Sequence, residues 1–426
     1  MANNGNNGNG AGATVDDDRS LIADLDAAMA RGCDFLSKNL PQHAGTWLAG
    51  PQFAGTTLTC GAHMLLPLAY TAAGRRADAV RAMDHIVDRF FRASDAGDGC
   101  DGGNAALGWM SAYQPAWACV TAVQMGRPDV AQKLVRRVLA FQGTGALGGF
   151  YGGRKEAAAG RGVFCFDTSG AAIHACLWAG ELEAARRGGA YLLALARASD
   201  ARRWYWCLDS DGNAVDSFAH PSWRHNAAPP AETGWPPMND ERWCFMAKDA
   251  PGQAHWKTGF YLANCTYLYR ATDDRRYLAA ALKCARFALG TADARATPPW
   301  PMWGHKLAWG ASELYRATGA PRIRAMARGL GEMLARRQDK EVGFWRYEEW
   351  WGPDIQARHP SAVYSIAAQS VTWMGHVKGA LAYTPPADAA LSAFVEAALT
   401  GEQREDGGDG DGGDDGGSSA KRQRTS

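Results

Sequence analysis

Two kinds of segment with helical character alternate along most of the chain. In the first kind, apolar residues recur every three or four positions, as at Val130, Leu134, Val138 and Phe141. This spacing is typical of a helix with one face in water and the other against protein. The pattern therefore predicts amphipathic helices that begin near residues 20, 76, 128, 182, 275 and 321.

The second kind of segment is rich in Ala, Gly and Leu and is nearly free of charge on most sides. A helix that is apolar almost all round is expected to be surrounded by other protein. Short turns with Gly or Asp, such as Gly126 and Asp273-Asp274, join the two kinds. The enclosed segments are residues 60–73, 113–125, 168–179, 256–271, 305–317 and 361–381.

Six enclosed and six amphipathic helices predict an all-α fold, an (α/α)6 toroid. The enclosed helices would form an inner ring, the amphipathic helices would surround it, and the first helix would close against the last. Self-similarity at about 50 residues supports such an array over a bundle of unrelated helices. We expect one domain over residues 19–400, with an insertion at 199–255 that is long enough to be a lid.

Residues 1–18 and 401–426 differ from this pattern, because they are polar and rich in glycine. Such segments bury too little apolar surface to offset the entropy of ordering, so we expect disordered tails. The start has no basic and then apolar run, which predicts no secretory signal. The basic run Lys421-Arg422-Gln423-Arg424 could be a nuclear address or part of a solvated tail.

The composition argues against several classes of partner. With 45 Lys and Arg residues against 44 Asp and Glu residues, the formal charge is +1, so nothing electrostatic favours nucleic acid or an anionic membrane. No run approaches the roughly 20 apolar residues of a membrane-spanning helix. The ten cysteines form no CxxC pair, as expected in a reducing compartment. We expect a soluble, cytoplasmic protein that acts on a small molecule, with its oligomeric state open.

A short motif, Gln followed by Gly and an aromatic residue, recurs at predicted helix ends. It occurs as Gln42-His43-Ala44-Gly45-Thr46-Trp47, and again as Gln338 followed by Gly343-Phe344-Trp345. A third copy, Gln142 with Gly148-Gly149-Phe150, has Phe in place of Trp. The Gln amide can bond the loose backbone groups at a helix end while the ring covers them.

These motifs resemble the QW repeats of the terpenoid cyclase and prenyltransferase-like α/α-toroid superfamily. As architecture, the resemblance covers most of residues 20–382. The segments Phe166–Gly170 and His305–Gly310 look like segments of uncharacterised toroid proteins in that group. Linalool dehydratase-isomerase is a related single-toroid precedent for chemistry on a short isoprenoid alcohol. The resemblance implies a toroid and, as one hypothesis, isoprenoid chemistry.

The chain departs from the terpenoid enzymes in its acidic motifs. It contains no DxDD, the acid that protonates an alkene in class II cyclases, and no DDxxD, which binds diphosphate through magnesium in class I enzymes. The nearest match, Asp273-Asp274-Arg275-Arg276-Tyr277, falls at a predicted hairpin turn. The resemblance therefore supports the fold better than the reaction.

Asp167 is expected at the start of an inner helix, where the helices of a toroid converge on a funnel. It could act as an acid or as an orienting carboxylate, or it could cap the helix, as Asp often does. His174 lies seven residues further on, on the same helix face, so the two could shuttle a proton. A hydrogen-bonded core histidine is the alternative interpretation of His174.

Other polar residues open inner helices at the equivalent place. His305, His255 and Tyr113 do so, and we predict them as proton-transfer partners of Asp167. The residues expected to contact the substrate are Trp256, Trp309, His63, Trp206, Tyr261 and Lys306.

A metal site would need a set of Cys and His ligands. Toroids similar to lanthionine cyclases hold zinc with two Cys and one His, and this chain has Cys60, Cys207 and Cys244 with His255 or His305. No two of these residues form a ligand pair at a fixed spacing, so we predict no metal and no cofactor. Zinc would be the first candidate if a metal were bound.

Tryptophan is unusually frequent, with 17 residues, and most of those beyond residue 200 fall in loops or at inner-helix starts. These indoles could plug one end of the toroid. If they line a cavity instead, their faces could stabilise a carbocation, by about 0.5–2 kcal/mol per ring, or stack on a sugar. Barrels of the (α/α)6 class also host glycosidases, epimerases and lyases.

Three functional hypotheses follow. The first is a terpenoid-cyclase-like enzyme that isomerises, cyclises or dehydrates an isoprenoid-like molecule in an aromatic funnel. The second is a carbohydrate-active enzyme, which as a glycosidase would need two carboxylates about 5–9.5 Å apart. The third is a non-catalytic scaffold whose funnel is plugged by its own indoles. The carboxylates available to the second hypothesis are Asp167, Asp209, Asp211, Asp240, Glu241, Glu348, Glu349 and Asp354.

Overall fold

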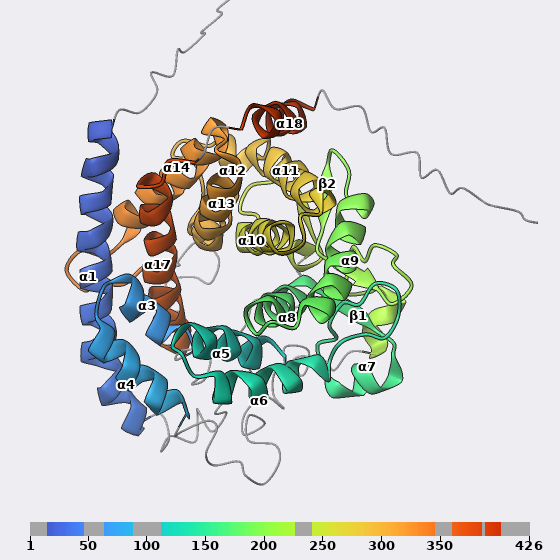
Figure 1. Ribbon diagram of the computed structural model, residues 1–426, viewed down its shortest axis with the longest axis horizontal. Coiled ribbons are helices and arrows are strands. Elements are labelled where there is room, and N and C mark those ends of the chain that lie inside the picture. Colours follow the sequence, from blue (N-terminus) through green and yellow to red (C-terminus); the bar gives the residue numbers. More distant parts are fainter. Residues whose placement is uncertain are drawn as a thin grey trace, which may run out of the picture.

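The computed structural model describes residues 15–46, 64–87, 112–225, 241–345, 360–385 and 388–401. Its helices form two concentric rings (Figure 1), so the predicted all-α toroid is confirmed. The inner ring consists of α3 (Leu66–Ala72), α5 (Tyr113–Gln124), α8 (Phe166–Trp178), α10 (His255–Thr272), α13 (His305–Thr318) and α17 (Pro360–Leu381). The outer ring consists of α1 (Val15–Thr46), α4 (Arg76–Ile86), α6 (Pro128–Leu139), α9 (Leu182–Ala198), α11 (Arg275–Leu289) and α14 (Pro321–Arg337).

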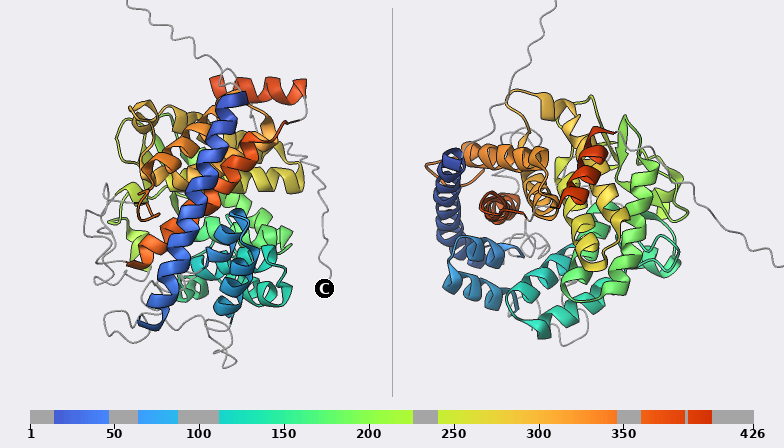
Figure 2. Two further views of the ribbon diagram at one scale, coloured as in Figure 1. Left: turned by 90° about the vertical axis from the view of Figure 1, so that its left-hand side faces the viewer. Right: turned by 45° about the horizontal axis from the view of Figure 1, so that its top comes forward.

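The inner ring is closed. Each inner helix contacts the next in the order α3, α5, α8, α10, α13, α17, and α17 contacts α3. The two ends of the domain meet as predicted, because α1 packs along α17 and also contacts α14 (Figure 2). In this ring α5 and α13 stand three places apart in a circle of six, so they face each other across the interior.

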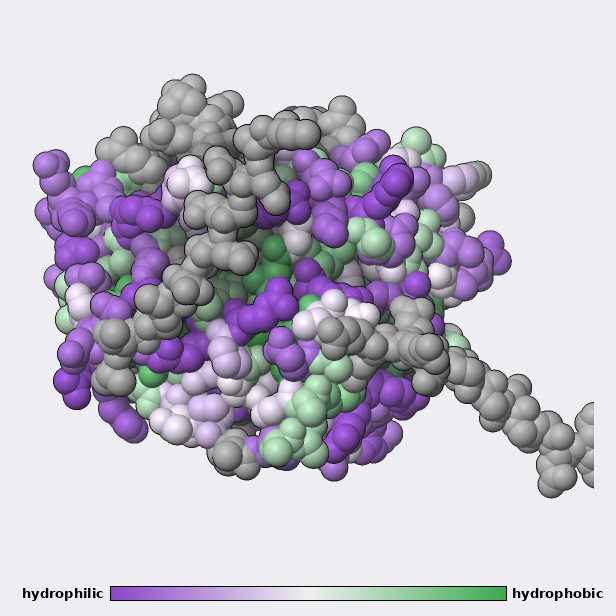
Figure 3. Space-filling view, turned by 90° about the horizontal axis from the view of Figure 1, so that it is seen from above, coloured by the Kyte–Doolittle hydropathy of each residue, from purple (hydrophilic) through white to green (hydrophobic). Residues whose placement is uncertain are grey.

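The two kinds of sequence pattern produce the two rings. On α6 the residues Val130, Leu134 and Val138 are buried and the remaining face is largely exposed. On α10, by contrast, every residue from His255 to Thr266 is buried. Seen from above, hydrophilic residues cover much of the described surface, and strongly hydrophobic ones show mainly in a hollow near its middle (Figure 3). None of the described helices combines the length and apolarity that a bilayer span requires.

The first helix is longer than its hydrophobic pattern indicates. We predict Ser20–Asn39 from the pattern, whereas α1 spans Val15–Thr46. Three aspartates occupy its first turn, where carboxylates are favoured by the helix dipole. One of them, Asp18, is buried and forms ion pairs with Arg324 and Arg328 of α14. Residues 15–18 therefore belong to a helix and not to the predicted N-terminal tail, and Gln42 lies within the helix rather than after it.

Short strands in and beside the 199–255 insertion are the main departure from an all-helical chain. Strand β1 (Val163–Cys165) pairs with β3 (Cys207–Asp209), and β2 (Arg203–Tyr205) pairs with β4 (Phe245–Ala247), both antiparallel. Trp204 and Trp206 from this segment are fully buried. The strands of the insertion thus pack into the core, whereas residues 216–223 are exposed or half-buried; residues 226–240 lie outside the described residues, and the lid stays a prediction.

Several small elements complete the fold. An additional helix, α18, follows the last inner helix and packs on α11 and α13; the hairpin pattern does not predict it. The remaining elements are α7 (Arg154–Ala159), α12 (Ala292–Arg295), the 3-10 helices η5 (Pro221–His225), η7 (Glu241–Trp243) and η8 (Met302–Gly304), and α18 (Ala389–Thr400).

In the two described copies of the recurring motif, the Gln side chain donates to backbone carbonyls of the neighbouring outer helix. At the end of α14, Gln338 Nε2 donates to the Gly343 carbonyl and, 2.8 Å away, to the Ala28 carbonyl of α1. Trp345 Nε1 donates to the Leu334 carbonyl at 2.7 Å. Gln142 likewise links the end of α6 to Ala184 of α9. The motif thus ties neighbouring outer helices together; this role is structural and does not identify a family.

Two glycines set the distance between α10 and α13. A Cβ atom added at Gly259 would lie 2.0 Å from the Lys306 carbonyl oxygen, and one added at Gly310 would lie 2.2 Å from the Gly259 carbonyl oxygen. Real Cβ atoms do not approach backbone oxygens so closely, so only glycine permits this contact. The two backbones are therefore packed directly against each other.

We predict that Gly259→Ala lowers the free energy of unfolding by about 3 kcal/mol, because the new methyl group forces the two helices apart. Gly329→Ala is the matched control, since a Cβ atom at this helical position has no neighbour within 4 Å. Alanine should stabilise that position by about 0.5–1 kcal/mol. Urea unfolding of both variants measures the difference. Equal stabilities would show that the helices are not in backbone contact.

Candidate functional site

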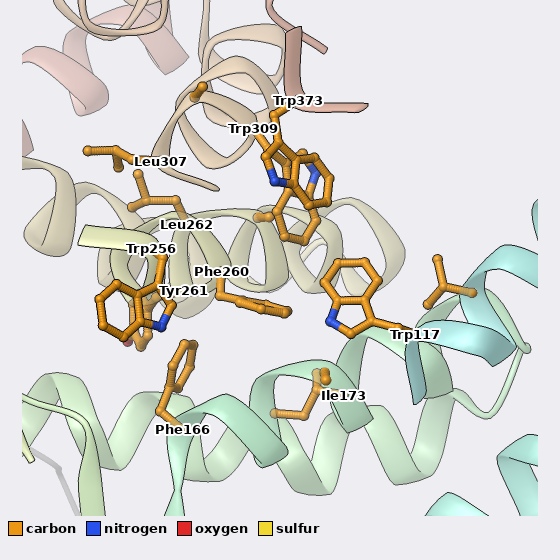
Figure 4. Close-up of a cluster of buried hydrophobic side chains, with 14 of the residues drawn as sticks. Trp117, Phe166, Ile173, Trp256, Phe260, Tyr261, Leu262, Leu307, Trp309 and Trp373 are labelled. Carbon is orange, nitrogen blue, oxygen red and sulfur yellow. The ribbon is translucent and has the colours of Figure 1, made fainter. Parts of the chain in front are cut away.

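An indole layer fills the middle of the inner ring. Trp117 of α5 lies 5.9 Å from Trp309 of α13 and 5.8 Å from Trp373 of α17, measured between ring centroids. Trp309 and Trp373 stack at 4.8 Å with an interplanar angle of 13°. Phe260 of α10 points between Trp117 and Trp309 (Figure 4). This part of the toroid interior is therefore plugged by side chains from four inner helices.

A polar layer lies one helical turn nearer the N-terminal ends of the inner helices. Tyr113 precedes Trp117 by four residues, and Lys306 precedes Trp309 by three. The Lys306 Nζ atom donates to the Tyr113 hydroxyl oxygen at 3.0 Å. Because α5 and α13 face each other, this hydrogen bond crosses the interior of the ring.

A second polar contact belongs to the same layer. His305 Nε2 lies 3.1 Å from Gln369 Oε1, and Gln369 is four residues before Trp373 on α17. Burial, together with the neighbouring charge of Lys306, lowers the pKa of His305 to about 3. The imidazole is therefore neutral at ordinary pH, and its Nε2–H donates to the Gln369 carbonyl oxygen.

Lys306 has an unusual electrostatic environment. Only 5% of the residue is exposed, and 9% of Tyr113. Its ammonium group lies 4.9 Å from the Phe260 ring centroid and 5.6 Å from that of Tyr113. Among the described residues no carboxylate forms an ion pair with it. Two aromatic faces and a phenol oxygen are thus its partners, and none carries a compensating negative charge.

Asp167 is held in an ion pair. It is the second residue of α8 rather than its N-cap, which is Cys165, so it does not cap the helix. One carboxylate oxygen accepts from Trp256 Nε1 at 2.9 Å and the other lies 3.0 Å from Lys257 Nζ. Lys257 also donates to the Trp243 carbonyl at 2.6 Å. The carboxylate therefore anchors α10 and the insertion to α8.

The charge of Lys257 is maintained by Asp167. Burial lowers the pKa of Lys257, but the negative charge of Asp167, the neighbouring thiols of Cys165 and Cys207 and the hydrogen bond to Asp167 together raise it more, so the net pKa lies above the ordinary value. Both partners are almost completely buried. The Trp256 N–H and the Lys257 ammonium thus occupy the two carboxylate oxygens of Asp167.

His174 lies in the indole layer. Its ring stacks on Tyr267 at 5.4 Å and meets Trp309 edge-on at 5.0 Å. Burial and, secondarily, the charge of His376 lower its pKa to about 3, so it is neutral. No hydrogen bond joins it to Asp167 within the described structure. The structure does not bring this pair together as a proton relay.

His255 points away from the polar layer. Its Nε2 lies 2.9 Å from a carboxylate oxygen of Asp293, which also accepts from the backbone of Gly252 and Gln253. Its ring meets Trp300 edge-on at 5.2 Å. These partners belong to or flank α12, so His255 fixes the start of α10 from outside the inner ring.

The predicted substrate-contacting aromatic residues occupy different places. Trp256 lies beside Asp167, and Trp309 belongs to the indole layer. The hydroxyl of Tyr261 donates to the Leu192 carbonyl of α9, and Trp206 packs against Phe166 at 5.3 Å. Tyr261 therefore packs between the two rings. His63 lies outside the described residues.

No metal centre is evident in the described ranges. They contain no group of three or more His, Cys, Asp or Glu side chains suited to hold an ion. Cys207 and Cys244 are buried free thiols, and Cys60 lies outside these ranges. Burial raises the pKa of Cys207 well above its ordinary value.

A charged layer, which the sequence analysis missed, lies on the C-terminal side of the indoles. Glu313, four residues after Trp309, accepts from His376 Nδ1 at 2.9 Å and from Arg270 at 3.0 Å, and lies 3.4 Å from Arg316. Burial raises the pKa of Glu313, but His376 and the two arginines lower it further, to about 2. The sequence holds one signal for this layer, because Glu313 is the one carboxylate in α13, a helix with few charged residues.

Comparisons with known proteins give distant structural similarity. No protein-family model and no curated protein matches the chain. The GH76A alpha-1,6-mannanase from Salegentibacter sp. HEL1_6 is similar with a TM-score of 0.49 and 15% identity, over 76% of this chain and 89% of that one. An inactive variant of that enzyme in complex with alpha-1,6-mannotriose is similar with a TM-score of 0.47 and 14% identity. That comparison covers 75% of this chain and 89% of the variant's chain.

We predict that Asp167→Asn lowers the free energy of unfolding by about 3 kcal/mol, because it leaves the Lys257 ammonium buried without a counter-ion. Removing both charges, with Asp167→Leu and Lys257→Met together, should recover most of this loss. Thermal and urea unfolding of the single and double variants form the test. A double variant no more stable than Asp167→Asn would contradict the ion-pair interpretation.

Glu313 makes a pH-dependent contribution to stability. Its folded-state pKa, about 2, lies below the ordinary value of 4.5, so the contribution is present above pH 4.5 and is lost as the pH falls towards 2. Between pH 7 and pH 3 we expect a loss of about 2 kcal/mol from this group. Unfolding of wild type and Glu313→Gln at both pH values measures it. An identical pH dependence in the two proteins would refute the assignment.

Proposed function

We propose that this protein is a carbohydrate-active enzyme whose sugar substrate binds at the polar layer, on the N-terminal side of the indoles. The observation that carries this proposal is the hydrogen bond from Lys306 to Tyr113 across the interior of the ring. With His305 and Gln369, it gathers an ammonium, a phenol, an imidazole and an amide from three inner helices. Such a set of donors and acceptors complements the hydroxyl groups of a sugar.

The same layer argues against the isoprenoid hypothesis. A C10–C15 chain would need an apolar space with free aromatic faces to stabilise a cation. The indoles that could supply those faces are packed on one another, as in the Trp309–Trp373 stack, and each is at most 1% exposed. The side chains on the N-terminal side of these indoles are polar. The side chains therefore favour a hydroxylated substrate over a hydrocarbon.

The arrangement of carboxylates bears on the reaction. A glycosidase uses two carboxylates that flank the scissile bond. Asp167 is bonded to Lys257 and Trp256, and Asp209 accepts from the backbone of Asp211 and Asn213 in its own turn. Tyr113 is a group that can transfer a proton to or from the substrate. We propose Tyr113 as the proton-transfer residue and Lys306 as the residue that orients it.

The test is turnover of a panel of neutral and acidic glycosides, followed by NMR of the products. We expect Tyr113→Phe to lower kcat by about 10²–10⁴-fold, because the variant retains the ring but loses the transferable proton. Tyr383→Phe is the control, since Tyr383 lies at the surface, 36% exposed, and its activity should equal that of wild type.

The products separate the alternatives. An unsaturated or epimerised sugar would support proton transfer by Tyr113, whereas new reducing ends without any unsaturated product would reassign the reaction to hydrolysis. Turnover of isoprenoid alcohols with no binding of any sugar would overturn the proposal.

A further inference from the structure

We infer that Lys306 recognises a carboxylate on the substrate, so that the sugar is a uronic acid or another sugar acid. This inference rests on the proposed function and specifies its substrate class. Its starting point is a difference between Lys306 and two other cations of the inner helices, the buried Lys257 and Arg270, whose side chain is 36% exposed. Lys257 is paired with Asp167, and Arg270 is paired with Glu313. Lys306 alone among these three has no anionic partner in the described residues.

An unpaired buried charge is costly. Taking an ammonium group out of water without a counter-ion disfavours folding, and aromatic faces offset this cost only in part. The groups around Lys306 are Tyr113 of α5, Phe260 of α10 and the neutral His305 beside it on α13. None of them can neutralise the charge. A ligand that brings a negative charge to this position would do so.

The hydrogen-bonding capacity of Lys306 agrees with this inference. An ammonium group has three N–H donors. One of them is directed to the Tyr113 hydroxyl, and no other acceptor for Lys306 is present among the described residues. Two donors therefore remain for a ligand, and a carboxylate offers two acceptor oxygens. The contact would be charge-assisted, which makes it stronger than a bond to a neutral hydroxyl.

The single charge favours a carboxylate over a phosphate. A phosphate ester carries close to two negative charges at neutral pH and is usually held by several cations or by a glycine-rich backbone cradle. In the polar layer Lys306 is the one cation without an ion pair among the described residues, and the sequence contains no phosphate-binding glycine motif. A monoanion matches one ammonium group. We therefore commit to a carboxylate.

Ligand affinity tests the inference directly. Calorimetric titration with methyl glucuronide and methyl glucoside, and with the galacto pair, compares each sugar acid with its neutral counterpart. We expect wild type to bind at least one uronide about tenfold or more tightly than the neutral glycoside, and Lys306→Met to lose this preference. Lys340→Met removes an exposed lysine and is the matched control, which should retain it.

Thermal unfolding provides a second measurement that does not depend on activity. Methionine preserves the length of the side chain and removes the unpaired charge, so Lys306→Met should have a Tm equal to or above that of wild type. The uronide should raise the Tm of wild type and leave that of the variant unchanged. A purely structural lysine would give the opposite result, a lower Tm for the variant.

The outcomes distinguish the two proposals. Equal binding of acidic and neutral sugars, or a preference unchanged in Lys306→Met, would overturn the carboxylate inference while leaving a carbohydrate function in place. Tighter binding of glucose 6-phosphate than of any uronide would also overturn it. Binding of no sugar at all would remove the proposed function itself.

Discussion

The backbone contact between α10 and α13 determines the position of the α13 side chains along the axis of the toroid. Gly259 and Gly310 bring the two helices so close that neither can slide along the other without a clash of backbone atoms. This contact fixes Lys306, Trp309 and Glu313 on successive turns of α13. Each of these three side chains then contacts a partner on α5 or α17 that lies at the same position along the axis of the toroid. The register of one helix pair thus sets all three layers of the interior.

The charged layer and the polar layer differ in their electrostatic environment. At the C-terminal side, Arg270, Arg316 and His376 surround the carboxylate of Glu313. At the N-terminal side, Lys306 has aromatic rings and a phenol around it. The indoles between them keep these groups apart. The layer that contains a carboxylate has the properties of a structural element, and the layer without one has those of a binding site.

The sequence predicts the rings well because the period of the outer helices is a direct signature of one buried face. It also identifies Lys306 and Tyr113 individually, since both open inner helices. It does not reveal their contact, or Gln369, Trp373 and Glu313, because an enclosed helix is apolar on every side and its pattern does not show which side faces the axis. Successive residues on a helix are about 100° apart, so His255, Trp256 and Lys257 cannot all face one funnel. The structure directs His255 to Asp293 and Lys257 to Asp167.

Lys257 and Lys306 differ in whether the protein itself supplies a counter-ion. For this reason Asp167, the carboxylate that stands out in the sequence, says less about a ligand than Lys306 does. Asp167 and Lys257 satisfy each other, so this pair is complete without any ligand. Lys306 occupies an equally early position on its helix, yet the fold supplies no anion for it in the described residues. A protein that retains such a charge forgoes stability that an apolar side chain would provide. This loss of stability has a reason if the substrate brings the missing negative charge, because the ion pair formed on binding then offsets the cost of burying Lys306.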